Sequence, residues 1–347
     1  MPDFIEGDPE TARIAFVIDH PSDYELMYKK PMTGPAGHLF NECLEQALIL
    51  RSDCYLTTLF KRKIHKRYKK ETFFNENWEP LFTPGKKAFS DEGFQHVLDL
   101  DEELKNVKAN IILPLGPASL KALCNLDNLS KWRGSIMPAT LGSVEKRKTI
   151  PTYSPANILY KNFVQKYVIA QDLKKAYGES FFPELVRPKY KFRLSPTFNE
   201  CLEVLEFIKT LEKYTCDIEI GYVGHELDPK GQCTRIAFCW NELTGISIPY
   251  ADGNWSEEQE AMLWLKTAEV LEMEGPLKIF HNGCFDIQFL MFIHGIMTAP
   301  PYADTMVSHH IVYPDFPKSL AFCASLHTKQ PFWKDMVKHA NIENPEG

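Results

Sequence analysis

The stretch CDIEIG, residues 216–221, places Asp217 and Glu219 one residue apart in a run that otherwise has the composition of a buried β-strand. Side chains two positions apart in a strand lie on the same face of the sheet. Burying an unpaired carboxylate costs several kcal/mol, so two on one face need a positive charge between them. A metal ion is the usual partner, and the stretch therefore indicates a metal site on a sheet.

The segments around this stretch predict a mixed sheet. Three consecutive strands joined by short turns form an antiparallel meander, and the candidates are 216–223, 234–240 and 244–251. A helix over 256–273, a strand over 277–282 and a helix from 284 follow in the apolar pattern. This order of elements is the one that an RNase-H-like fold would give.

A third carboxylate follows in HNGCFDIQFL, residues 281–290, where Asn282 and Asp286 are four positions apart. The change from strand to helix falls between them, so Asp286 should lie in the first helical turn. In an RNase-H-like sheet this strand lies near the first one. We therefore expect Asp286 to converge with Asp217 and Glu219.

The two motifs, D-x-E and then N-x-x-x-D, resemble the first two motifs of the DEDD 3′–5′ exonucleases, in particular the proofreading domain of phage-like family A DNA polymerases. The stretch over 303–335 is similar to the helical segment that follows the second motif there. The resemblance covers about residues 197–345. It implies removal of nucleotides from a single-stranded 3′ end of DNA, in association with a polymerase domain or subunit.

The same resemblance implies a role for each residue. Asp217 and Asp286 would be metal ligands, and Glu219 would bind one ion and orient the attacking water. Asn282 would help to hold the substrate strand. Hard oxygen ligands favour Mg²⁺ or Mn²⁺, so the implied cofactor is a pair of such ions that hydrolyses the phosphodiester.

The resemblance also implies a fourth carboxylate, in a Y-x-x-x-D motif soon after PFWKD (331–335), and the sequence reaches Gly347 without one. His310 and Asp315 imitate the spacing of an alternative motif, but Asp315 lies in a proline-flanked stretch that we expect to be a loop. We expect a fragment of a longer polymerase, a chain completed in trans, or a poor catalyst. A non-catalytic DNA-binding module that works with a polymerase in trans is the alternative.

The first half of the chain alternates strand and helix signals, which predicts a parallel sheet with helices on its faces; the segments are 12–19, 36–50, 54–60 and 110–116. The stretch 178–197 is rich in proline, aromatic and charged residues. A domain boundary is therefore expected near residue 187. The fold class is α/β, with domains over 1–186 and 187–347.

Five stretches of the first domain are similar, in their order, to the uracil-DNA glycosylase superfamily: FVIDHPSDYE (16–25), TGPAGHLFNECLEQA (33–47), NIILPLGPASLKAL (110–123), WRGSI (132–136) and TYSPANILY (152–160). The resemblance implies that Asp19 occupies the position of the acid that activates water. Ser154 stands where the family has a histidine, and its hydroxyl cannot supply the donor that stabilises the departing uracil anion. We expect a vestigial glycosylase site in a DNA-binding or structural domain, with an active glycosylase as the alternative.

Residues 61–70 hold seven lysines and arginines in ten positions. Such a run next to a DNA-processing domain predicts a patch that contacts phosphates. The alternative is a solvent-exposed surface without a role in binding. The residues proposed for DNA contact are Lys61, Arg62, Lys63, Lys66 and Arg67.

The bulk composition sets the class of protein. The net charge of −7 makes any nucleic-acid surface a local feature. Nine scattered cysteines without a CxxC pair are typical of reduced thiols in a cytoplasm, here that of a bacterium or a phage-infected host. The N-terminus is acidic and no apolar run is long enough to span a bilayer, so we expect no membrane partner.

Overall fold

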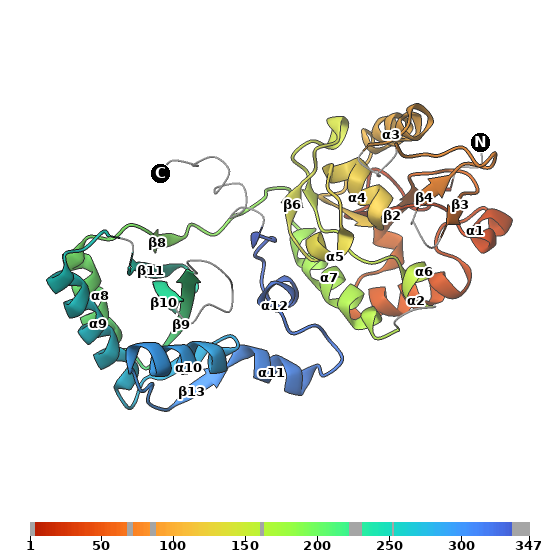
Figure 1. Cartoon of the computed structure of the whole chain (residues 1–347). Coiled ribbons are helices and arrows are strands. Elements are labelled where there is room, and N and C mark those ends of the chain that lie inside the picture. The colour runs from red at the N-terminus through yellow and green to blue at the C-terminus, as the bar shows by residue number, and fades with distance from the viewer. Residues whose placement is uncertain are drawn as a thin grey trace. The chain divides into compact units, whose positions relative to one another are not determined.

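The structure is a computed structural model and describes residues 4–67, 72–83, 88–159, 163–221, 231–251 and 253–334. The chain forms two compact units (Figure 1). The first unit comprises Met1–Val186 and Ala321–Gly347, and the second comprises Arg187–Leu320. The chain passes from the first unit to the second at Arg187, and the described residues from Ala321 to Lys334 belong to the first unit.

The sheet of the first unit has the strand order β2-β1-β5-β7-β6. Its strands are β1 (Ile14–Ile18), β2 (Cys54–Thr58), β5 (Ile111–Leu115), β6 (Met137–Pro138) and β7 (Lys148–Thr149). All neighbours are parallel except β6 and β7. Every residue of β1, β2 and β5 is buried, as in a parallel sheet with both faces covered.

Helices cover both faces of this sheet. Side chains of α3 (Asp91–Leu104) and α4 (Pro117–Cys124) share one apolar core with Ala15 and Val17 of β1. Side chains of α2 (Gly34–Gln46) and α7 (Gln165–Glu179) share the apolar core of the other face with the alternate residues of β1, which are Ile14, Phe16 and Ile18. The remaining elements are α1 (Asp23–Tyr28), η1 (Arg51–Asp53), β3 (His65–Arg67), β4 (Thr72–Phe74), α5 (Leu129–Trp132), η2 (Gly142–Val144) and α6 (Pro155–Ile158).

The second unit has a six-stranded mixed sheet in the order β13-β12-β9-β10-β11-β8. Its strands are β8 (Lys191–Arg193), β9 (Lys213–Gly221), β10 (Gln232–Asn241), β11 (Thr244–Pro249), β12 (Leu277–Phe280) and β13 (Tyr302–Asp304). β9, β10 and β11 form an antiparallel meander, and β12 and β13 continue from β9 in parallel. The expected RNase-H-like fold is confirmed by this strand order.

The helices of the second unit are α8 (Phe198–Ile208), α9 (Glu257–Glu272), α10 (Gly283–His294) and α11 (Thr305–Val312), while α12 (Leu320–His327) leads back to the first unit. Figure 1 shows α8 and α9 side by side. Each begins with a capping box, from Thr197 and Ser256 respectively.

Candidate functional site

The D-x-E motif lies on β9, the strand at the middle of the second sheet. Burial alternates along it: Tyr214, Cys216 and Ile218 are buried, and the residues between them are exposed. Asp217 and Glu219 therefore share one face, as expected, but the expectation of a buried strand is wrong for that face. The alternation is that of a sheet with one face on the core.

Asp286 reaches β9 from α10. It lies in the first turn of the helix, is buried, and its Oδ1 accepts a hydrogen bond of 3.1 Å from the backbone N–H of Ile218. Ile218 stands between Asp217 and Glu219 in the strand. The hydrogen bond thus ties the third carboxylate to the stretch that carries the first two.

The electrostatics of the site indicate an accumulation of negative charge. Burial raises the pKa of Asp286 to about 6, the N–H of Ile218 opposes this, and the charges of Asp217 and Asp304 add to it. Burial also raises the pKa of the Cys233 thiol, to which the charges of Asp286 and Glu219 contribute. Both carboxylates therefore act on one neighbouring thiol, and a cation at this place would offset their repulsion.

The donor chemistry of this face fits a hard divalent cation, because all three side chains are carboxylates. Their positions do not form a closed ligand set: in the part of the chain that the structure describes, no three His, Cys, Asp or Glu side chains are grouped to hold a metal ion. The charge of Asp217 acts on Asp286, as does that of Asp304. Metal binding would thus require Glu219 or a further ligand to move in.

Asn282 immediately precedes α10 and is exposed. Its backbone is left-handed, with φ of 66°, and its side chain makes no capping hydrogen bond. The cap comes instead from Asp304, whose two oxygens accept from the backbone N–H groups of Asn282 and Gly283 at 3.1 and 2.8 Å. Asp315, as expected, lies outside any helix and is exposed.

The first unit carries a pocket that brings two of the expected residues together. Asp19 follows β1 and Ser154 follows β7, and both line the pocket with Ile18, His20, Ser22, Glu25, Met32, Ala36, Ala156 and Asn157. The carboxyl ends of parallel strands meet at one edge of a sheet, which explains why residues 135 positions apart share a cavity.

Asp19 is held inside this pocket by α4. Its Oδ1 accepts from the N–H and the Oγ of Ser119, at 2.8 and 2.9 Å. Burial raises the pKa of Asp19, against these hydrogen bonds and the charge of His20. A side chain at Gly116, whose φ is 143°, would place its Cβ 2.4 Å from the Asp19 carboxylate, so only glycine fits there.

Glu25, a second buried carboxylate of the pocket, is not among the residues expected from the sequence. It accepts hydrogen bonds from the backbone N–H groups of Ser22 and Met32. The signal that could have found it is S-x-x-E at residues 22–25, a capping box that opens α1.

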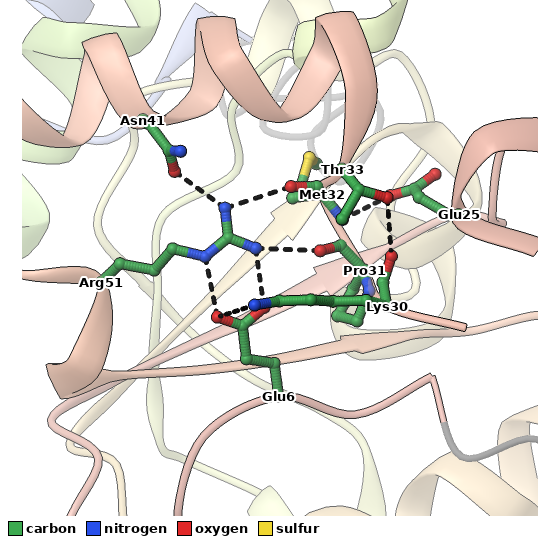
Figure 2. A network of polar contacts seen from close by, with 8 residues as sticks. All are labelled: Glu6, Glu25, Lys30, Pro31, Met32, Thr33, Asn41 and Arg51. Carbon is green, nitrogen blue, oxygen red and sulfur yellow. Dashed lines mark hydrogen bonds and ion pairs between the residues drawn. The ribbon is translucent and has the colours of Figure 1, made fainter. Parts of the chain in front are cut away.

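Figure 2 shows how the loop beside this pocket is held. The guanidinium of Arg51 binds both oxygens of Glu6 at 2.8 and 2.7 Å, and it donates to the backbone oxygens of Pro31 and Met32 at 2.9 and 3.1 Å. On the side away from Arg51, the Glu25 carboxylate accepts a hydrogen bond from the N–H of Met32 (Figure 2). The backbone of Met32, which lines the pocket, is therefore fixed from two directions.

The basic run is partly neutralised within its own unit. Lys61 lies 2.6 Å from Glu103, and its side chain is only 15% exposed, so it has a structural ion pair rather than a free charge for DNA. Arg62 pairs with Glu76 at 3.6 Å and Lys63 with Asp23 at 2.9 Å, both at the surface. Lys66 and Arg67 lie on β3. Residues 68–70 are outside the described ranges.

The residues that return from the second unit are bound to the α5–β6 turn and to α7. Ser325 Oγ accepts from the buried Arg133 at 2.5 Å, and the backbone N–H of Phe332 donates to Ser135 Oγ at 3.1 Å. Lys329 lies 2.8 Å from Glu179. These contacts are the physical reason that the segment from Ala321 belongs to the first unit.

Comparison with known proteins bears on both units. Residues 4–176 match the model of the uracil DNA glycosylase superfamily. The chain is 27% identical over 157 residues to the type-4 uracil-DNA glycosylase of Archaeoglobus fulgidus, covering 44% of this chain and 69% of that protein. The first unit thus contains a uracil-DNA-glycosylase-like domain, and the expected resemblance is confirmed.

A second relative is a DNA polymerase of Bacillus phage SP01, 26% identical over 328 residues, which are 87% of this chain and 33% of the polymerase. The chain therefore spans about a third of the length of that relative. Among solved structures, Escherichia coli RNase D, an exoribonuclease involved in structured RNA processing, matches with a TM-score of 0.32 and 16% identity, over 43% of this chain and 36% of that one. A score this low adds nothing to the fold assignment, which depends on the strand order.

Within the described ranges, no helix is both long and apolar enough to span a membrane.

Proposed function

We propose that the second unit is a 3′–5′ exonuclease that removes nucleotides from single-stranded 3′ ends of DNA. The observation that carries this proposal is the hydrogen bond from the Ile218 N–H to Asp286, which ties a helix carboxylate to the strand between Asp217 and Glu219. Carboxylates are acceptors only, so the charges of Asp217, Glu219 and Asp286 would repel a phosphate unless cations intervene.

The residues would divide the work as follows. Asp217 and Asp286 would hold Mg²⁺ or Mn²⁺, and Glu219 would complete the first ion's ligands and accept a proton from the attacking water. The exposed side chain of Asn282 would contact the terminal nucleotide. Two bound ions would supply charge neutralisation of the scissile phosphate and of the leaving 3′ oxygen.

Association with a DNA polymerase is the second part of the proposal. The phage polymerase that aligns with 87% of this chain supports it. The partner would be a polymerase domain or subunit, and the reaction would be proofreading. A non-catalytic DNA-binding module serving such a polymerase is the alternative if the carboxylates bind no metal.

The test is digestion of a 5′-labelled single-stranded oligodeoxynucleotide with Mg²⁺ or Mn²⁺. We expect a ladder that shortens from the 3′ end and that disappears in Asp217→Ala. Thr215→Ala is the matched control, because Thr215 lies on the same face of β9 two residues away. DNA binding without shortening in the wild type would reject the exonuclease and favour the binding module.

For the first unit we propose a nucleobase-binding pocket without excision activity. Asp19 and Ser154 share the pocket, but Ser119 holds the Asp19 carboxylate, and a serine hydroxyl cannot replace the imidazole donor. The test is release of uracil from a uracil-containing oligonucleotide, read as alkali-labile sites. We expect no release by the wild type; release that is lost in Asp19→Asn would establish an active glycosylase instead.

A further inference from the structure

We propose that Asp304 is a positioning residue of the exonuclease site, which fixes the start of α10 and so aligns Asn282 and Asp286 with β9. The inference rests on the proposed nuclease function. At first sight Asp304 is the ordinary N-cap of α11, since its side chain accepts from the N–H groups of Met306 and Val307. Its other contacts go beyond that role.

The carboxylate of Asp304 serves two helices. Oδ1 accepts from Met306 N at 2.8 Å and Val307 N at 3.3 Å in α11, and from Asn282 N at 3.1 Å at the start of α10. Oδ2 accepts from Gly283 N at 2.8 Å. Two helix N-termini, whose N–H groups have no partner within their own helices, thus meet at one carboxylate.

The start of α10 depends on this external cap. Asn282, a residue type that often caps helices, is in the left-handed conformation and contributes no capping bond from its side chain. Gly283 leaves no room for a substituent, because a Cβ there would lie 2.4 Å from Cβ of Phe280. The cap therefore reaches α10 from the neighbouring strand β13, about 20 residues later in the sequence.

A second tether supports the same junction. Thr305 Oγ1 donates to the backbone oxygen of Phe280 at 3.0 Å, and the His281 ring nitrogen Nδ1 lies 2.9 Å from the same hydroxyl. Phe280, the last residue of β12, and His281 after it are thus bound to Thr305, the first residue of α11. Asp304 and Thr305 together hold both sides of the turn from β12 to α10.

The position of Asp286 depends on this cap through one helical turn. Asp286 is three residues after Gly283, and its Oδ1 must meet the Ile218 N–H of β9. A misplacement of about 1 Å in a catalytic group can lower the rate about 100-fold. Loss of the cap at Asn282 and Gly283 should therefore lower kcat more than it changes KM.

Three variants at one position separate this role from ordinary capping. Asp304→Ala removes all four hydrogen bonds that the carboxylate accepts. Asp304→Ser retains a good N-cap for α11 but is too short to span to Gly283. Asp304→Asn keeps the length and one acceptor oxygen. Ser256→Ala, which removes the cap of α9 in the same unit, is the matched control for lost stability.

We expect Asp304→Ala to lower kcat of the exonuclease about 100-fold at nearly unchanged KM, and to lose more thermal stability than Ser256→Ala, which removes the cap of one helix. Asp304→Ser should recover only the part of the stability that comes from the cap of α11, and no kcat, whereas Asp304→Asn should recover part of the kcat. Recovery of kcat by Asp304→Ser, or an equal loss of kcat in Ser256→Ala, would overturn the proposal and leave only a helix cap.

A readout without activity keeps the test independent of the proposed function. Amide hydrogen exchange should show faster opening of residues 283–286 in both Asp304→Ser and Asp304→Ala, and normal protection in Ser256→Ala. If the wild type degrades no DNA, the exonuclease proposal fails. Unchanged exchange at 283–286 in Asp304→Ser would refute the positioning role whatever the activity of the wild type.

Discussion

Asp19 directly follows β1 and Asp286 lies in the first turn of α10; both carboxylates are buried, and the fold stabilises them differently. Asp19 receives two hydrogen bonds from Ser119, including one from a side chain. Asp286 accepts one from the backbone of Ile218, and the charges of Asp217 and Asp304 raise its pKa. At the scale of the residue, hydrogen-bond donors of one serine hold Asp19, whereas Asp286 experiences the charges of two other carboxylates.

Ser119→Ala should destabilise the chain by about 1–3 kcal/mol, because a hydrogen bond to a buried carboxylate is lost. Urea denaturation measures the effect. In an Asp19→Asn background, the loss of stability caused by Ser119→Ala should be smaller, because the acceptor then carries no charge. A double-mutant cycle in which the two effects simply add would contradict this pairing.

Asp286→Asn should stabilise the metal-free chain at alkaline pH. The pKa of Asp286, about 6, lies above its ordinary 3.8, so the folded state holds the proton more tightly than the unfolded one. The stability that this tighter proton binding contributes is fully present below about pH 4 and is lost as the pH rises through 6. Since Asn resembles the protonated acid, we expect a gain of about 2–3 kcal/mol at pH 8.

Melting of the two proteins in chelator between pH 4 and pH 8 measures this difference, which should vanish at pH 4. Asp315→Asn is the control, because Asp315 is exposed and lies outside any helix, so its replacement should change stability little. A gain for Asp286→Asn of the same size at both pH values would indicate altered packing instead of charge.

At the scale of the element, the turn from β12 to α10 decides where the second motif lies. The sequence correctly places Asp286 in the first turn of a helix. The steric reason for the turn is Gly283, which packs directly on Phe280. The turn is therefore constrained by packing from one side and by Asp304 from the other.

Gly283→Ala should cost about 1–3 kcal/mol, because the added methyl group overlaps Phe280 and the start of α10 must shift. The exonuclease rate should fall with it. Gly178→Ala is the matched control: Gly178 lies near the end of α7, its Cβ would meet nothing within 4 Å, and alanine there should gain up to about 1 kcal/mol. Thermal melts and the oligonucleotide assay check both, and a harmless Gly283→Ala would show that the turn can relax.

At the scale of the whole molecule, the first unit is built from two separate parts of the chain. The second unit is thus connected to the first through both of its ends. The nearly fully buried Arg133 donates a hydrogen bond to Ser325 Oγ in the returning segment, and Lys175 donates one to the Ser325 carbonyl. Residues far apart in sequence therefore share the stability of one unit.

Ser325→Ala should destabilise the first unit by about 1–3 kcal/mol, since the buried Arg133 loses a partner. Hydrogen exchange should locate the change in α5 and α7. Thr328→Ala is the control, because that exposed hydroxyl bonds only within its own segment, and it should have an effect within about 0.5 kcal/mol. Equal, small effects of both variants would mean that the returning segment contributes little to the unit.

The sequence by itself determined the class of each sheet and the place of the acids in it. Alternating and continuous apolar runs are local patterns, and the strand-to-helix change between Asn282 and Asp286 is readable from adjacent residues. The same holds for the positions of Asp19 and Ser154 at strand ends. These features need no knowledge of long-range contacts.

Tertiary structure alone decided which charges remain available and which segments belong together. Lys61 is a surface lysine by sequence, and becomes a structural one because Glu103 lies 42 positions later on α3. Asp304 caps α11, which begins at the next residue, and reaches a second helix because β12 and β13 are neighbours. The segment after Ala321 follows the second unit in sequence but packs on Arg133. Each of these depends on a contact between distant residues, and sequence periodicity describes only residues within one element.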